Sequence, residues 1–169
     1  MALHLQYAAL IAFVGLMSVA AFEDLRRLVI PNAVPLALCG LWPLYIMASP
    51  SLFGVLSAIG CALIVFVVGA VCFSRGLLGG GDVKLLTVAT LWAGPAQTPS
   101  LLMLTGVLGG LLAMFLLIPT GAQLATLARI KLGPAAAADP SGPQLATPVP
   151  YGIAIASAAV LVIFLPYFR

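Results

Sequence analysis

Charged side chains are scarce in this sequence. They make up 7% of the 169 residues, whereas 63% are hydrophobic and the mean hydropathy is +1.23. So few polar groups cannot form an ordinary water-exposed surface, which excludes a soluble globular protein. No basic stripe interleaves with aromatic residues, so nothing indicates a nucleic-acid partner. We expect a polytopic membrane protein of the all-α class, with the lipid bilayer as its surroundings.

Residues that bind metals are also few. The sequence has three cysteines, Cys39, Cys61 and Cys72, and one histidine, His4. The cysteines lack CxxC spacing and have no histidine nearby to complete a metal site. We expect them to be small buried apolar residues. We therefore predict no metal ion and no cofactor.

Apolar runs interrupted by charges, prolines or glycines predict one bundle of six transmembrane helices. The predicted helices are 5–22, 33–48, 52–73, 82–93, 100–118 and 150–168. The fourth, of about 12 residues, is shorter than a spanning helix normally is. We interpret residues 1–169 as a single membrane-embedded domain, with a retained N-terminal helix and a flexible cytoplasmic linker at 133–149. Within the charged region before the linker, segment 120–132 is a candidate for a helix along the membrane surface.

The basic residues predict an orientation. If the helices alternate in direction, most basic side chains fall on one side of the membrane, which the positive-inside rule assigns to the cytoplasm. These residues are Arg26, Arg27, Arg75, Lys84, Arg129 and Lys131. Both termini are then expected outside.

Acidic residues are the rarest charged group. The four are Glu23, Asp24, Asp82 and Asp139. Asp139 lies in the predicted linker and is most simply a solvated charge. The other three lie where predicted helices meet the cytoplasmic face, either as interfacial anchors beside basic residues or as functional groups, since ionisable groups at membrane level are costly.

Three consecutive glycines precede Asp82. Gly79, Gly80 and Gly81 remove side chains and permit backbone conformations closed to other residues. A flexible linker is one interpretation; the other is an Asp presented at the rim of the bundle, with room beside it for an extended peptide. Asp24 is expected at a similar depth. Two facing carboxylates cannot both ionise cheaply, so such a pair can do acid and base work on one water molecule.

Three motifs resemble those of the prepilin peptidases, a family of membrane aspartic endopeptidases. GGGDVKLL at 79–86 fits their GxGD motif, DLRRLVIPN at 24–32 is similar to their first aspartate motif, and VPYG at 149–152 is a third match. The resemblance implies that Asp24 and Asp82 are the catalytic pair, and that Asp24 rather than its neighbour Glu23 is selected. It gives Gly79, Gly80, Gly81, Lys84, Arg27, Pro31, Asn32, Tyr151 and Gly152 roles in shaping the site or binding substrate.

The resemblance also implies a substrate and a location. The substrate is a prepilin or pseudopilin with a short basic leader ahead of an apolar helix, cut at the cytoplasmic boundary of the inner membrane. Larger family members carry a cytoplasmic insertion with paired cysteines that is associated with zinc and N-methylation. This chain lacks it, so we do not expect methyltransferase activity. The short form is similar to the peptidases of tight-adherence (Flp-type) pili and, more distantly, to archaeal preflagellin peptidases; it implies no particular oligomeric state.

Two other classes of function remain open from the residues. A small transporter could use an unwound glycine segment and a membrane-level Asp to bind a cation. A non-catalytic subunit of a pilus or secretion assembly could use the same Asp residues as partners for a neighbouring helix. Such a subunit would tolerate Asp-to-Asn changes that inactivate a protease.

Overall fold

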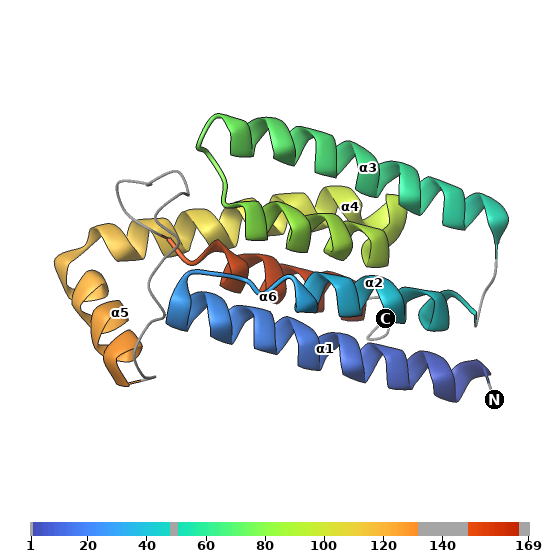
Figure 1. Cartoon of the computed structure of the whole chain (residues 1–169), viewed down its shortest axis with the longest axis horizontal. Helices are drawn as coiled ribbons and strands as arrows, with labels where there is room; N and C mark the ends of the chain where they lie inside the picture. Colours follow the sequence, from blue (N-terminus) through green and yellow to red (C-terminus); the bar gives the residue numbers. More distant parts are fainter. Residues whose placement is uncertain (1, 48–50, 132–148, 166–169) are drawn as a thin grey trace.

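The computed structural model describes residues 2–47, 51–131 and 149–165, which are helical and contain no strand (Figure 1). The helices are α1 (Ala2–Arg27), α2 (Ala33–Ile46), α3 (Leu52–Ser74), α4 (Gly80–Leu117), α5 (Pro119–Lys131) and α6 (Tyr151–Phe164). Three of them, α1, α3 and α4, are long and apolar enough to cross a membrane, and α2 and α6 are shorter apolar helices. The predicted all-helical membrane bundle is confirmed. The predicted linker, apart from Val149, and Asp139 lie outside the described residues.

Helix α4 is folded back on itself at Gly94, where the backbone leaves the helical region with φ 68° and ψ 177°. Figure 1 shows residues 95–117, here called the return segment, running back alongside residues 80–93, the outgoing segment. Asp82 and Gly106 line one cavity, although in a continuous helix they would lie about 36 Å apart. The two helices predicted at 82–93 and 100–118 are therefore both present. The break between them is the single residue Gly94. The return segment can begin at Pro95 because a proline in the first turn of a helix loses no hydrogen bond.

Gly94 should be sensitive to substitution, because its φ and ψ fall in a region that is essentially restricted to glycine. A Cβ there would meet no atom within 4 Å, so the cost of Gly94→Ala is conformational. We expect a loss of about 1–3 kcal/mol in the free energy of unfolding, measured by denaturant titration in detergent followed by circular dichroism. Gly60→Ala in α3 is the matched control, since its Cβ also meets nothing. Equal unfolding midpoints for the two variants would contradict the role of Gly94.

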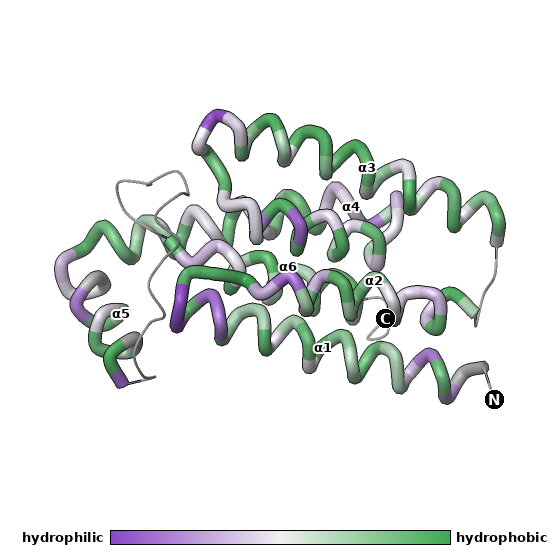
Figure 2. Tube along the Cα trace, in the orientation of Figure 1, coloured by the Kyte–Doolittle hydropathy of each residue, from purple (hydrophilic) through white to green (hydrophobic). Residues whose placement is uncertain are grey.

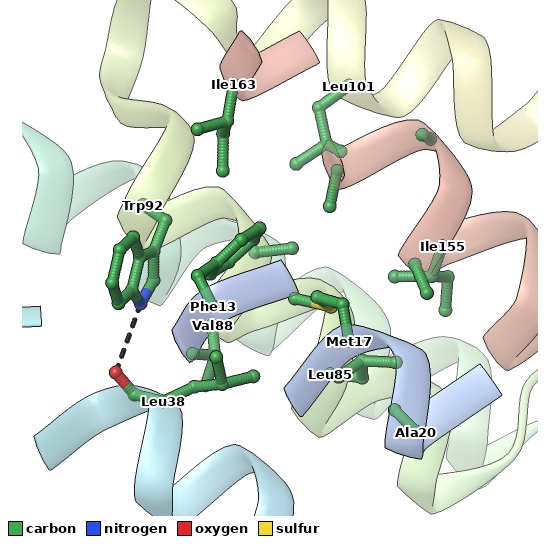
Figure 3. Close-up of a cluster of buried hydrophobic side chains, with 14 of the residues drawn as sticks. Phe13, Met17, Ala20, Leu38, Leu85, Val88, Trp92, Leu101, Ile155 and Ile163 are labelled. Carbon is green, nitrogen blue, oxygen red and sulfur yellow. Dashed lines mark hydrogen bonds between the residues drawn. The ribbon is translucent and has the colours of Figure 1, made fainter. Parts of the chain in front are cut away.

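The core holds the outgoing segment against α1 and α2. Trp92 is buried at the end of that segment, and its indole N–H donates a hydrogen bond to the Leu38 carbonyl of α2 at 3.1 Å (Figure 3). Its ring lies 4.6 Å from that of Phe13 in α1, centroid to centroid, within the range of favourable aromatic pairs. The outgoing segment also packs on α3, where Val83 lies against Gly69, so α1, α2 and α3 all contact it.

Several hydrophilic residues lie at the end of the bundle where α1 ends and α4 begins. Figure 2 shows them at the end of α1, in the connection from α3 to α4 and at the far end of α5. These places carry Arg26, Arg27, Arg75 and Lys131, so these four basic residues lie at one end; the side of the membrane that they face stays a prediction. The segment predicted as a surface helix does form helix α5, which contacts α4 and α1. Its position relative to a membrane stays a prediction.

Candidate active site

Asp24 lies in the last turn of α1. The helix ends after Arg27 because Leu28 adopts a left-handed φ of 55° and donates its N–H to the Asp24 carbonyl at 2.9 Å, which is the αL form of helix termination. Pro31 follows in the connection to α2. The Asp24 side chain is 5% exposed. A carboxylate this buried needs hydrogen-bond partners from the protein.

Gly152, at the start of α6, supplies one of those partners. Its backbone N–H donates a hydrogen bond to Asp24 Oδ2 at 2.6 Å, so the carboxylate lies at the positive end of the α6 dipole. A Cβ on residue 152 would lie 2.8 Å from Asp24 Oδ2 and 2.9 Å from Cβ and Cγ of Asp24. Only glycine lets the start of α6 approach Asp24 this closely. The resemblance implied a role for Gly152 in shaping the site or binding substrate, and in the structure Gly152 directly contacts Asp24.

Glu23 and Arg27 interact with each other along α1. They form an ion pair between Glu23 Oε2 and Arg27 Nε at 3.1 Å, one helical turn apart. Arg27 is 41% exposed and Glu23 19% exposed, so such a pair contributes little to stability. Glu23 therefore has a local partner on its own helix, whereas Asp24 is the acid that contacts α6.

Asp82 is held at the first turn of α4. Gly79 precedes the helix with an extended backbone, and the Asp82 carboxylate accepts a hydrogen bond from the Gly79 backbone N–H, the arrangement of a capping box. A Cβ on Gly79 would lie 2.8 Å from Asp82 Oδ2. A side chain at position 79 would therefore press on the Asp82 carboxylate in its present position.

The other two glycines are used for packing. A Cβ on Gly80 would lie 3.3 Å from the Phe73 ring, and one on Gly81 would lie 3.1 Å from the Ile30 Cβ. The space beside them is filled by the chain's own side chains, which differs from the expected room for an extended peptide. Because Ile30 belongs to the connection between α1 and α2, Gly81 brings the two aspartate motifs into direct contact.

The two aspartates lie at the same end of the bundle. The ends of α1 and the starts of α4 and α6 lie together there (Figure 1), and the Asp24 carboxylate is close enough to Asp82 to interact with it electrostatically. Asp82 also shares a cavity with Tyr151, the neighbour of Gly152. Two carboxylates, a helix N-terminus and a cavity are therefore assembled from three separate motifs.

Lys84 and Asn32 lie apart from this pair. Lys84 Nζ donates a hydrogen bond to Asn32 Oδ1 at 2.9 Å, and both residues line a second cavity, between α2, α3 and the outgoing segment. Asn32 precedes α2 but makes no side-chain capping bond; its carbonyl accepts from the Leu36 N–H, and that of Pro31 from the Val34 N–H. Lys84 therefore connects α4 to the start of α2.

This connection should be weak, because both side chains are exposed. In a double-mutant cycle with Lys84→Met and Asn32→Ala, we expect a coupling below about 1 kcal/mol in the free energy of unfolding. Both single variants should retain the activity of the native chain. Loss of that activity in a folded Lys84→Met protein would instead place Lys84 in the chemistry.

A model of the type IV leader peptidase family matches residues 11–114, more than half of the 169-residue chain. The chain belongs to the type IV leader peptidase family. In this leader peptidase family member, the part of the chain that matches the family model includes both aspartates. Tyr151 and Gly152 lie outside that part. No curated protein and no solved structure matches the chain.

The residues opposite Asp82 in this leader peptidase family member were not predicted from the sequence. Leu102, Thr105 and Gly106 of the return segment line the Asp82 cavity. Thr105 is the one polar side chain in the apolar run 101–118, which is the signal that could have singled it out. In the described part of the chain, no group of three or more His, Cys, Asp or Glu residues could hold a metal ion.

Proposed function

We propose that this chain is an aspartic endopeptidase that removes the basic leader from prepilin or pseudopilin precursors. Membership of the leader peptidase family supports a membrane protease. The observation that carries the finer proposal is that Asp24 accepts the N–H at the start of α6 while Asp82 lies near enough to interact with it electrostatically and lines a cavity with Tyr151 of the same helix start. We assign Asp24 rather than Glu23 to the pair, and the ion pair of Glu23 with Arg27 on its own helix supports this choice.

The proposed chemistry uses the two carboxyl groups on one water molecule. Repulsion between neighbouring carboxylates favours a state in which one is ionised and the other holds a proton. The ionised group takes a proton from water as the water oxygen attacks the scissile carbonyl carbon, and the protonated group donates to the carbonyl oxygen. The tetrahedral intermediate then collapses: the C–N bond breaks, and the leaving nitrogen takes the proton that the first carboxylate removed from water. One hydroxyl of the intermediate returns its proton to the second carboxylate, and a carboxyl product forms.

The proposed location is the cytoplasmic side of the inner membrane, with both termini outside. The basic residues at the end of α1 and before α4 lie at the same end of the bundle as the aspartates (Figure 2), and such residues mark the cytoplasmic side of a membrane protein. A substrate with a basic leader in the cytoplasm and an apolar helix in the bilayer would present its junction at this level.

The proposal does not include N-methylation. Residues 28–32 alone separate α1 from α2, in contrast to the cysteine-bearing insertion of the larger prepilin peptidases. The short connection instead places Ile30 against Gly81. The form of the chain favours a pilin of the tight-adherence type as substrate.

Cleavage by the purified chain tests the proposal. The native protein in detergent micelles is incubated with a precursor that has a short basic leader and an apolar N-terminal helix, and products are followed by gel mobility and N-terminal sequencing. We expect one new N-terminus at the junction between the leader and the helix. Failure of a folded native chain to cut a panel of such precursors would refute the proposed function.

A further inference from the structure

The cavity that contains Asp82 extends between the two segments of α4 and the start of α6. Its volume is about 190 Å³, and its lining includes Asp82, Leu86, Leu102, Thr105, Tyr151 and Ile155. The outgoing segment, the return segment and α6 each contribute apolar walls. It is separate from the cavity beside Lys84 and Asn32, which lies on the other side of the outgoing segment.

The hydroxyl of Thr105 has no hydrogen-bond partner, although its oxygen is buried. The other three threonines of α4 behave differently: Thr87, Thr90 and Thr98 each donate to the carbonyl four residues earlier, at 2.7 to 2.8 Å. This is the usual arrangement for a threonine inside a helix. A buried hydroxyl without a partner costs free energy. Because Thr105 lines the cavity, a ligand there that reached this hydroxyl would relieve the cost.

The size and polarity of the cavity indicate which ligand fits. Apolar cavities of about 150 Å³ hold a benzene molecule, so this one has room for an apolar side chain as large as an aromatic ring. A hydroxyl both donates and accepts hydrogen bonds. It therefore matches the main-chain N–H or C=O of an extended peptide, which has no partner in its own chain.

We propose that this cavity receives the apolar substrate side chain next to the scissile bond, and that the Thr105 hydroxyl binds the substrate main chain beside it. The inference rests on the proposed function, and it adds a substrate-binding residue from the return segment. In this arrangement Asp82 and Thr105 face the same stretch of peptide from opposite walls. Thr105 holds the peptide and takes no part in proton transfer.

Thr105→Val tests the hydrogen bond, because it removes the hydroxyl with little change in shape. We expect KM for a precursor in mixed micelles to rise roughly tenfold with kcat nearly unchanged, the pattern of lost substrate binding. Thr105→Ser should restore most of the affinity. Thr87→Val is the matched control, since that hydroxyl already bonds Val83, and its KM should stay at the native value.

The size of the cavity is tested through Gly106. A Cβ on Gly106 meets no atom within 4 Å, and the same holds for Gly110, one turn further along the helix. Gly106→Leu should fill the cavity and lower kcat/KM for a precursor with a Phe after the cleaved bond by at least about tenfold, relative to one with Ala there. Gly110→Leu should leave this ratio unchanged.

These outcomes separate the inference from the proposed function. If the native chain cuts no precursor, the proposed function fails. If the native chain cuts and Thr105→Val matches Thr87→Val in KM, or if Gly106→Leu leaves the Phe-to-Ala ratio unchanged, the substrate-binding role of this cavity is wrong while the function stands. A fall in kcat alone for Thr105→Val would also overturn the inference, because it indicates a structural role.

Discussion

Replacing Asp24 or Asp82 with Asn is expected to lower precursor cleavage by about 10²- to 10⁴-fold, the usual contribution of a positioned acid or base. Asn has nearly the shape of Asp, and its side-chain oxygen can still accept the Gly152 N–H that lies 2.6 Å from Asp24. The loss should therefore come from chemistry rather than folding. Cleavage rates of purified variants, with melting temperatures recorded in the same detergent, measure both effects.

Glu23→Gln is the matched control for this pair. It neutralises the adjacent acid, whose 3.1 Å partner is Arg27 on the same helix, and it should keep near-native cleavage. If either Asn variant still cleaves the precursor at a near-native rate, the two-aspartate mechanism is wrong. That result would favour the assembly-subunit or transporter interpretation instead.

Gly152→Ala has the second large expected effect. The new Cβ would lie 2.8 to 2.9 Å from three atoms of Asp24, closer than real Cβ contacts allow, so either the carboxylate or the start of α6 must move. A misplacement of about 1 Å in a catalytic group can cost about 10²-fold in rate, and we expect a loss of that order. Overpacking should also cost about 1–3 kcal/mol in the free energy of unfolding.

Gly15→Ala in α1 serves as the control for Gly152→Ala, because a Cβ there meets nothing within 4 Å and alanine favours a helix. Its activity and stability should equal or exceed those of the native chain. A folded Gly152→Ala protein with native cleavage would show that the contact between α6 and Asp24 does not position the carboxylate.

The sequence predicted the helices well because their signals are local. Apolar runs located α1, α2, α3 and α6 to within a few residues, and proline and glycine marked the break in α4. The predicted break covered residues 94–99, whereas in the structure Gly94 alone is non-helical. The break is shorter than predicted because Pro95 suits the first turn of a helix. The motifs also singled out Asp24 and Asp82, whose catalytic role stays a prediction.

Contacts between distant segments could not be predicted in the same way. Asn32 is a residue type common in turns, yet its side-chain oxygen accepts a hydrogen bond from Lys84 of another helix. The pattern VPYG does not reveal that the Gly152 N–H points at a carboxylate on α1. Thr105 resembles other helical threonines in sequence, and only the fold-back at Gly94 brings it opposite Asp82.

The reversal at Gly94 has a consequence for how the protein is made. The outgoing segment, about 21 Å long at 1.5 Å per residue, is too short to cross a hydrocarbon core of about 30 Å, so its end needs internal partners. One such partner is the Thr98 hydroxyl, which donates a hydrogen bond to the Gly94 carbonyl at 2.7 Å. Thr98 belongs to the return segment and is therefore synthesised after the turn. We therefore expect the outgoing and return segments to enter the bilayer together as a hairpin during synthesis.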